Sequence, residues 1–493
     1  MPLVPLTIPP GVSKQGTDYQ NANRWNSSSL VRWSENTMRP VGGWRERTSA
    51  MTGICRKILT WIDNSGVRQT AAGTQSKLYA VTQANTLADI TPGSFTSGAA
   101  DSVTNLGFGG LTYGLSTWGT ERPDQGTYTP VTTWSLDTWG QYLMGCSTAD
   151  GKIYQWQLDS STPTVAAVVT NAPTSCQAVF ISEERFVFAL SPAGIKNKLQ
   201  WSDQEAETTW TPASSNQAGS FILSTPGSLL SGHRLRGESL FLTDVDAHVA
   251  RYIGPPLVYG FQQVGTGCGA ISANSCAVAN GSAYWMGLKG FYFYNGRVQD
   301  IACEVSDYVF SDMNQGQRSK TYAFYNQHFD EVWWFYPSAN STENDRYVSL
   351  NIKEGHWSIG ELGRTAAHGI GAFIYPNMVG TDSKVYEHEV GIIENDSYPV
   401  FAESGPLQIG NGDRLMSVDE LIPDEKTQGD VTATFKTKLY PNGDETSHGP
   451  YSLANPTSVR LQGRQVEVRI DQSKDTDWRV GVMRFNAKAG SKR

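Results

Sequence analysis

The chain has few charged residues and no surplus of basic ones. Asp, Glu, Lys and Arg make up 17% of the 493 residues, and the formal net charge at pH 7 is −8. Charged residues form about a quarter of an ordinary soluble protein. Tight binding to a phosphate backbone needs clustered Lys and Arg side chains that release counterions. The composition therefore argues against a protein that holds nucleic acid tightly.

Long hydrophobic runs and paired cysteines are missing as well. No stretch approaches the ~20 apolar residues that span a bilayer, and residues 1–6 lack the basic start and apolar run of a secretory signal. The six cysteines contain no C-x-x-C pair, which argues against a disulfide framework. We expect them to be small buried apolar residues in a protein assembled in a reducing cytoplasm.

Glycine and aromatic residues are abundant, with 49 Gly, 15 Trp and 21 Tyr. Most apolar segments are short, rich in aromatic and β-branched residues, and bounded by Gly, Asn, Asp or Ser, as in 186–190, 240–243, 291–294 and 332–336. Such segments are typical of β-strands, and we expect Trp333 and Trp334 to be core residues of an inner strand. Helical periodicity is best developed over 304–313. The fold class is therefore predicted to be all-β.

A loose repeat organises the middle of the chain. A turn followed by an apolar-aromatic strand recurs at intervals of 75, 46, 50, 42, 57 and 37 residues, with anchors at Leu78, Ile153, Leu199, Val249, Phe291, Val348 and Val385. Periods near 40–50 with several strands each are typical of β-propeller blades, because one four-stranded sheet cannot bury both faces alone. The repeat predicts a β-propeller of six or seven blades over residues 51–395. A sandwich or an irregular β-protein is the alternative.

The first interval of 75 residues is too long for one blade. Its excess falls in residues 91–130, which are rich in Gly, Ser and Thr, and we expect an inserted loop or hairpin that projects from the ring. Long ordered loops are usually functional. The insertion carries apolar side chains that a solvated loop does not need, and these are candidate interaction residues: Phe108, Leu111, Tyr113 and Trp118.

The two ends of the chain lack this repeat. Residues 1–50 contain Pro5, Pro9 and Pro10 and are expected to form an extended N-terminal strap, pinned to a neighbour by its tryptophans. Residues 396–493 alternate apolar and polar positions, which predicts a small C-terminal β-sandwich-like domain. Residues 446–493 hold nine Lys or Arg and four Asp or Glu. This basic region is either an ordinary solvated sandwich face or a docking face for an acidic partner, with candidate residues Arg460, Arg464, Arg469 and Arg479.

Sequence motifs that would indicate catalysis, metal binding or cofactor binding are absent or incomplete. The G-x-x-x-x-G-K-[ST], H-E-x-x-H and G-x-S-x-G patterns are absent. The glycine-rich segment 265–269 has no strand–loop–helix context and is interpreted as a turn between blades. Glu387, His388 and Glu389 are interpreted as part of a solvated face, because neighbours in a strand point to opposite sides.

Two acidic segments are interpreted as structural rather than catalytic. Asp244 and Asp246 are expected in a strand-end turn, and Asp203, Glu205 and Glu207 in an acidic loop. We therefore assign no catalytic residue, no metal site and no cofactor, and we expect the protein not to be an enzyme.

The order of several motifs resembles a known family. These motifs are 133–140 followed by 151–156, Trp201-Ser202-Asp203 with Trp210-Thr211-Pro212, 251–256, 283–287, and 331–337 with 343–347. Together they resemble the tail hub or nozzle proteins of short-tailed bacteriophages, a group that includes packaged-DNA stabilisation proteins. The resemblance covers roughly residues 130–390.

The resemblance implies a structural virion protein. Such a protein forms a homo-hexameric ring below the portal and its adaptor, the head–tail connector protein. The ring extends the DNA channel, lets genomic DNA pass without tight binding, and helps to retain packaged DNA. It also carries needle, plug, fibre or spike proteins. The expected location is the virion tail, after assembly in the host cytoplasm.

Two competing functions remain open at this stage. A carbohydrate-active or glycan-binding propeller, such as a host-surface depolymerase, predicts convergent carboxylates at one mouth of the propeller. A bacterial scaffold or binding propeller is the other alternative.

Overall fold

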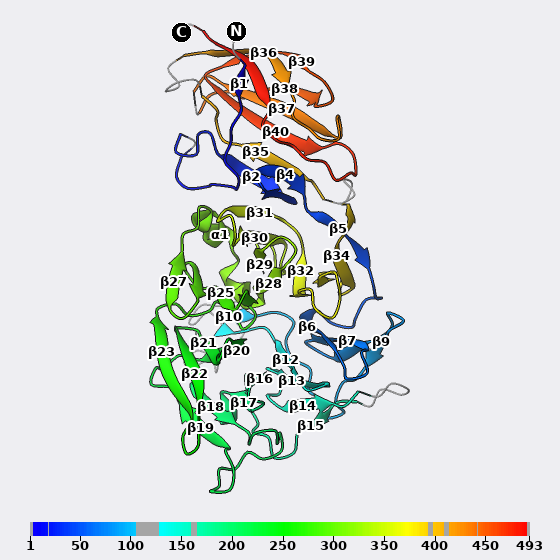
Figure 1. Cartoon of the computed structure of the whole chain (residues 1–493), viewed down its shortest axis with the longest axis vertical. Helices are drawn as coiled ribbons and strands as arrows, with labels where there is room; N and C mark the ends of the chain where they lie inside the picture. Colours follow the sequence, from blue (N-terminus) through cyan, green and yellow to red (C-terminus); the bar gives the residue numbers. More distant parts are fainter. Residues whose placement is uncertain are drawn as a thin grey trace, which may run out of the picture.

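A computed structural model describes residues 3–17, 19–104, 128–158, 165–392, 398–408, 414–440 and 442–490. Seven four-stranded antiparallel sheets are arranged around an axis, and a two-sheet domain sits at one edge of this ring (Figure 1). The predicted all-β propeller with a C-terminal sandwich is therefore confirmed, and the blade number is seven.

The strands of each blade follow one another in sequence from the axis outward. Blades 1 to 3 are β6 (Cys55–Ile62), β7 (Arg68–Thr74), β8 (Leu78–Val81) and β9 (Leu87–Asp89); β12 (Trp134–Trp139), β13 (Tyr142–Ser147), β14 (Ile153–Trp156) and β15 (Ala167–Val168); and β16 (Ala178–Ile181), β17 (Val187–Leu190), β18 (Lys198–Trp201) and β19 (Gly219–Ile222). Blades 4 and 5 are β20 (Leu229–Leu235), β21 (Glu238–Thr243), β22 (Asp246–Gly254) and β23 (Val258–Thr266); and β24 (Cys276–Ala279), β25 (Ser282–Met286), β26 (Phe291–Tyr294) and β27 (Val298–Ile301). Blade 6 is β28 (Tyr322–Asn326), β29 (Glu331–Tyr336), β30 (Arg346–Asn351) and β31 (Trp357–Glu361).

The seventh blade closes the ring with a strand from the other end of the chain. It consists of β32 (Arg364–His368), β33 (Asn377–Gly380), β34 (Val385–Ile392) and, as its outermost strand, β5 (Gly42–Glu46). The innermost strand β32 also packs beside β6 of the first blade. The ring is thus closed both by packing and by hydrogen bonds between strands about 340 residues apart in sequence.

The sequence repeat corresponds to one position in every blade. Its seven anchors all lie in the third strand, namely β8, β14, β18, β22, β26, β30 and β34. The seven anchor residues are all buried. The long first interval arises because the chain leaves β9 and returns at β12 through the predicted insertion.

Blades pack closely where a glycine faces an aromatic ring. A side chain added at Gly73 of β7 would lie 2.5 Å from the Trp134 ring of the next blade. One added at Gly232 of β20 would lie 2.8 Å from Phe180 of the preceding blade. A β-carbon does not fit at either distance, so these glycines are required for the approach of neighbouring sheets.

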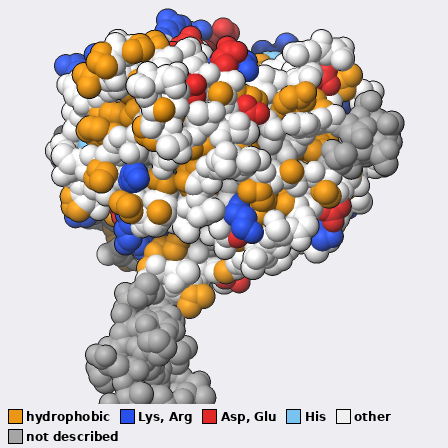
Figure 2. Space-filling view, turned by 90° about the horizontal axis from the view of Figure 1, so that it is seen from below, with side chains coloured by type: hydrophobic (Ala, Val, Ile, Leu, Met, Phe, Trp, Pro, Cys, Tyr) orange, Lys and Arg blue, Asp and Glu red, His pale blue; other side chains and the backbone are white. Residues whose placement is uncertain are grey.

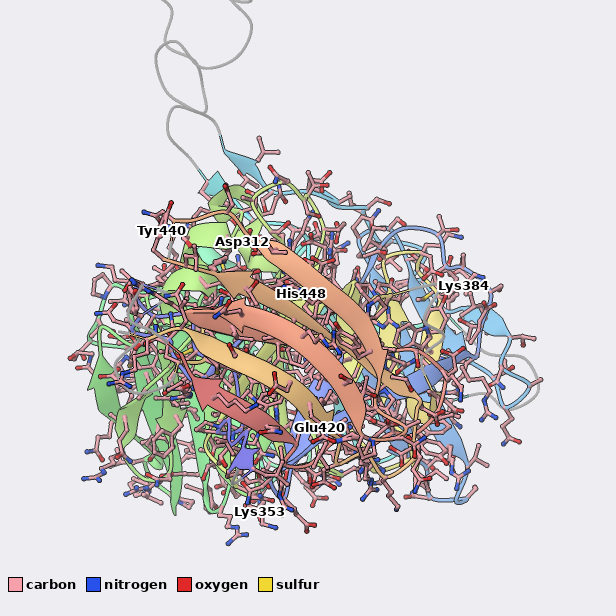
Figure 3. The ribbon with its side chains drawn as sticks, turned by 90° about the horizontal axis from the view of Figure 1, so that it is seen from above. Asp312, Lys353, Lys384, Glu420, Tyr440 and His448 are labelled. Carbon is pink, nitrogen blue, oxygen red and sulfur yellow. The ribbon has the colours of Figure 1, made fainter. Side chains whose placement is uncertain are left out.

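The C-terminal domain is a sandwich of two antiparallel sheets. One sheet is β1 (Val4–Pro5), β41 (Arg484–Ala489), β36 (Met416–Ile422) and β39 (Thr457–Gly463), and the other is β2 (Trp25–Ser29), β35 (Phe401–Ser404), β40 (Gln465–Gln472), β37 (Val431–Lys438) and β38 (Thr446–Ser452). Phe435 and Phe485, one from each sheet, pack with ring centroids 5.6 Å apart. Figure 3, viewed from above, shows these strands lying across the edge of the propeller, with Glu420 and His448 on the sandwich.

The N-terminal residues belong to both domains rather than forming a separate strap. Strands β1 and β2 complete the two sandwich sheets, β3 (Val31–Ser34) and β4 (Thr37–Pro40) form a hairpin, and β5 completes blade 7. The expected boundary at residue 51 is therefore wrong. The expected tryptophan contacts are present, since Trp25 and Trp33 are buried with centroids 5.8 Å apart and Trp44 stacks on His388 at 5.4 Å.

Helical structure is minor. The periodicity over 304–313 corresponds to α1 (Ser306–Asp312), and the short helices η1 (Pro192–Gly194) and η2 (Gln315–Lys320) lie in turns and connections. All six cysteines are buried and free, as expected. Trp333 and Trp334 are buried as predicted, but they lie in β29, the second strand of blade 6, rather than in the innermost strand.

Candidate functional site in the axial channel

A cavity of about 370 Å³ opens at the centre of the ring. It is lined by residues of the innermost strands β6, β12, β16, β20 and β24 and by His368 at the end of β32. Its polar groups come from several blades and include Lys57, Asp137, His233, Arg234 and Asn274. A concave site with a few convergent polar groups is the usual form of a small-molecule site.

Lys57 is the cationic group of the channel wall that has no carboxylate partner. Its ammonium donates a hydrogen bond to Asn274 Oδ1 at 3.1 Å and lies 5.4 Å from the centroid of the Tyr322 ring. Among the described residues no carboxylate lies within ion-pair distance of it. Burial lowers the pKa of Lys57 to about 8, although the charge of Asp137 opposes the shift.

Two histidines on the channel wall are neutral near pH 7. His233 shares a hydrogen bond with Ser231 Oγ at 2.9 Å, and His368 Nδ1 shares one with Thr60 Oγ1 at 2.8 Å. Burial, followed by the positive charge of Lys57, lowers the pKa of His233 to about 3 and that of His368 to about 4. These rings therefore add no charge to the channel.

Asp137 is the only carboxylate that lines the channel in the described structure, and it is already engaged. It forms an ion pair with Arg234, and its oxygens accept hydrogen bonds from the backbone N–H groups of Thr138 at 2.8 Å and Ile181 at 2.9 Å. Burial raises the pKa of Asp137 despite the contact with Arg234. Glycoside hydrolysis uses two carboxyl groups on either side of the bond that breaks, and this channel does not offer that pair.

A second polar cluster, which the sequence did not suggest, joins the N-terminal hairpin to blades 6 and 7. Arg32 of β3 contacts Glu331 at 3.0 Å and Glu389 at 2.6 Å; Arg32 and Glu331 are buried, and the side chain of Glu389 is 9% exposed. Burial alone would raise the pKa of Glu389, but the charge and hydrogen bonds of Arg32 bring it below its ordinary value. Burial keeps the pKa of Glu331 raised.

The expected solvated face at Glu387, His388 and Glu389 is therefore wrong. The pairing of β34 with β5 shifts register after His388, and Glu389 adopts a positive φ of 61°. The bulge lets Glu389 reach Arg32, while His388 accepts a hydrogen bond from Arg364 Nε at 2.8 Å. Burial and the charge of Arg364 hold the pKa of His388 well below its ordinary value.

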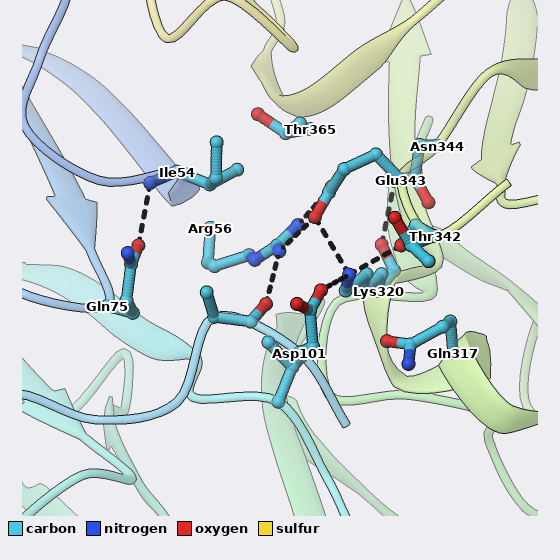
Figure 4. A network of polar contacts seen from close by, with 12 residues as sticks. Ile54, Arg56, Gln75, Asp101, Gln317, Lys320, Thr342, Glu343, Asn344 and Thr365 are labelled. Carbon is cyan, nitrogen blue, oxygen red and sulfur yellow. Dashed lines mark hydrogen bonds and ion pairs between the residues drawn. The ribbon is translucent and has the colours of Figure 1, made fainter. Parts of the chain in front are cut away.

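A third cluster fixes the base of the insertion to blade 6 (Figure 4). Arg56 of β6 and Lys320 of η2 both bind Glu343, at 2.6 and 2.8 Å, and Lys320 also binds Asp101 at 2.6 Å. The short strands β10 (Val103–Thr104) and β11 (Tyr128–Thr129) then pair at the start and end of the inserted segment. The candidate residues Phe108, Leu111, Tyr113 and Trp118 lie outside the described residues.

The four basic C-terminal candidates do not share one face. Arg460 is exposed on β39, whereas Arg469 lies on β40 in the other sheet of the sandwich. Arg469 binds Glu403 at 3.1 Å and stacks on Phe401 at 3.7 Å. Arg464 lies between these two strands, and Arg479 lies 3.7 Å from Asp477.

The remaining sequence candidates have structural roles. The glycine-rich segment 265–269 connects blade 4 to blade 5. Asp244 and Asp246 form the turn between β21 and β22, where buried Asp246 binds Thr243 and His248. Asp203, Glu205 and Glu207 lie in the loop after β18, and Asp203 accepts hydrogen bonds from the backbone N–H groups of Gln204 and Gln217.

Among the described residues no group of three or more His, Cys, Asp or Glu side chains is placed to hold a metal ion. In the same part of the chain no helix combines the length and hydropathy needed to cross a membrane.

Comparisons with solved structures return β-propellers. Virginiamycin B lyase from Staphylococcus aureus matches with a TM-score of 0.40 and 7% identity over 67% of this chain and 93% of its own. The Neurospora crassa Pan2 WD40 domain matches at 0.40 and 8% over 73% and 98%, and YCF48 bound to D1 peptide at 0.40 and 8% over 73% and 97%. No family model and no curated protein matches the chain. At these identities the likeness concerns the propeller fold alone.

Proposed function

We propose that this chain is a non-enzymatic structural subunit of a bacteriophage tail hub or nozzle, and that it assembles into a homo-hexameric ring below the portal and adaptor. The family resemblance of residues 130–390 supports the assignment of the chain to a bacteriophage tail. The observation that carries the assembly claim is an apolar outer edge on blades 3 and 4, at the end of the molecule far from the sandwich.

This apolar edge is built from the outermost strands of the two blades. Leu257 in the β22–β23 turn is 70% exposed, Ile222 on β19 is 57% exposed, and Ile253 near the end of β22 is 55% exposed. The rings of Phe221 on β19 and Phe261 on β23 stack with centroids 4.4 Å apart, which places the outer strands of the two blades side by side. Figure 2, viewed from below, shows small groups of hydrophobic side chains over this end of the molecule, interspersed with charged ones.

An exposed apolar surface next to free strand edges favours contact with another protein. In a ring with cyclic symmetry each subunit contacts the next through two different surfaces, and the contact repeats until the ring closes. In this proposal the apolar edge packs against the neighbouring copy. The sandwich, at the opposite end, remains free to bind the adaptor or a needle, plug, fibre or spike protein.

The proposal also accounts for the charge of the chain. Genomic DNA passes through the axis of the assembled ring, because the 370 Å³ channel within one subunit is far too small for a duplex. A wall with an acidic net charge does not hold the phosphate backbone, so the DNA slides without tight binding.

A double substitution on the apolar edge tests the assembly claim. Ile222→Ser with Leu257→Ser removes two exposed apolar groups, so the free energy of unfolding of the subunit should change by only about 0.5 kcal/mol. Association should weaken at least tenfold, which corresponds to a joint loss of about 1.4 kcal/mol from the two buried side chains. Analytical ultracentrifugation of the purified chain, alone and with the head–tail adaptor, measures this effect.

The matched control is Ile62→Ser, which removes an equally exposed apolar residue from blade 1. Undiminished ring formation by the double variant would show that the edge is not the subunit interface. If rings form but a distal tail protein is lost, the edge serves that protein instead and the assembly claim is wrong.

A further inference from the structure

The axial channel contains a positive charge that the fold does not neutralise. The Lys57 ammonium has three protons, and one hydrogen bond, to Asn274 Oδ1, is present. The amide nitrogen of Asn274 is itself occupied, because it donates to the backbone carbonyl of Arg56 at 3.1 Å. Lys57 therefore keeps unused donor capacity beside an open cavity of about 370 Å³.

The one carboxylate that lines the channel in the described structure is shared between Lys57 and a second cation. Asp137 on β12 is paired with Arg234 on β20. His233 on β20, His368 on β32, Cys276 on β24 and Tyr322 on β28 are all neutral at pH 7, because burial lowers the pKa of each histidine and raises the pKa of the thiol and of the phenol. Lys57 thus gives the channel wall a net charge of +1. In a setting with little water, this charge would interact strongly with an anion.

We infer that the axial channel of each subunit binds one small oxyanion, a phosphate or a carboxylate group, with Lys57 as the ligand that neutralises its charge. The ammonium donates its unused N–H groups to the anion oxygens. The neutral imidazoles of His233 and His368 tolerate the anion and can each present an N–H donor. The inference is independent of ring assembly, because all of these residues belong to one chain.

The cavity size and its charge limit the ligand class. The space suits a small molecule and excludes a nucleic-acid duplex, and one unpaired cation suits one anionic group rather than a polyanion. The binding site lies on rigid first strands of five blades and on the end of a sixth, so the donors are held in place before the ligand arrives.

Calorimetric titration of the full-length protein with inorganic phosphate, sulfate and acetate tests the inference. Saturable binding of one anion per chain is expected with at least one of the three, and Lys57→Gln should weaken it at least tenfold. A preference for phosphate and sulfate over acetate assigns a tetrahedral oxyanion, and the reverse preference assigns a carboxylate. Lys289→Gln, which removes a lysine from the β25–β26 loop outside the channel, is the matched control and should bind like the wild type.

The pH profile of the wild-type protein provides a second readout that does not depend on a variant folding. Sulfate keeps its charge between pH 6 and 10, so any loss of binding in that range reports on the protein. The lowered pKa of Lys57, about 8, predicts that affinity is constant at pH 6–7 and falls tenfold per pH unit well above pH 8. Absence of saturable binding by all three anions, unchanged affinity in Lys57→Gln, or a flat profile up to pH 10 would each overturn the inference.

Discussion

Replacing Arg32 by alanine should lower the free energy of unfolding by about 3–5 kcal/mol. The guanidinium is buried and pairs with two carboxylates, the buried Glu331 and Glu389, whose side chain is 9% exposed. Alanine would leave both carboxylates charged and without their cation in a low-dielectric environment, and would also remove the stacking of Arg32 on Phe329 at 3.6 Å. The loss should be large because it falls on the contact that joins β3 to blades 6 and 7 at the point where the ring closes.

Urea denaturation at several pH values measures this effect. In the variant, the pKa of each carboxyl group should be higher in the folded state than in the unfolded chain. The protonated carboxyl groups therefore do not destabilise the fold at low pH, and the folded state becomes less stable as the pH rises and the groups ionise. The penalty should therefore shrink on acidification from pH 7 toward about 4.5. Arg39→Ala is the control, since Arg39 pairs at 3.1 Å with the exposed Asp477 and such pairs are worth about 0–1 kcal/mol. Equal losses in the two variants would contradict the structural role given to Arg32.

Truncating Trp334 to alanine should also cost about 3–5 kcal/mol. Its side chain is fully buried in β29, with ring centroids 5.0 Å from Phe291 and 6.0 Å from Trp357, so it links blades 5 and 6. Its indole N–H donates to the backbone carbonyl of Ser275 at 3.0 Å, which would be left without that donor. The expected loss thus combines a cavity with an unsatisfied buried acceptor.

Thermal and urea unfolding of Trp334→Ala and Trp333→Ala measure this contribution. Phe293→Ala, which removes a half-buried ring stacked on Tyr284, serves as the control and should cost clearly less. A change below about 1 kcal/mol at both Trp333 and Trp334 would show that β29 is not part of the core.

The propeller could be predicted because its signal is local. Each blade repeats a turn and an apolar third strand within 37–57 residues, and the anchors from Leu78 to Val385 mark that strand in all seven blades. The alternation of apolar and polar residues over 431–438 and 465–472 is likewise a property of single strands. The sandwich strands β37 and β40 could therefore be predicted from the sequence.

The contacts that close the molecule could not be predicted, because their partners are far apart in sequence. Arg32 and Glu331 are separated by 299 residues, and nothing near either residue identifies the other. The strand 42–46 does not show the turn-and-strand repeat of the blades. Its position is fixed by its pairing with β34. The bulge at Glu389 reverses the expected direction of a charged side chain, so period-two reasoning placed it in solvent.

The candidate site was missed for a related reason. Lys57, Asp137, His233 and His368 come from four different blades and form no motif along the chain. The signal that could have located them is position within the repeat: a charged or imidazole side chain in the first strand of a blade faces the axis or a neighbouring blade. The exposed apolar edge on blades 3 and 4 could not be predicted either. Phe221 and Phe261 come into contact only when the two blades pack side by side.

The copy number of the chain in the native particle tests the central claim most directly. The measurement is the mass of the tail assembly isolated from virions, combined with an electron image of its shape. A ring of six identical chains attached to the portal adaptor is the predicted result. One copy of the chain per particle, or a chain that is never part of a ring, would contradict a ring-forming tail subunit.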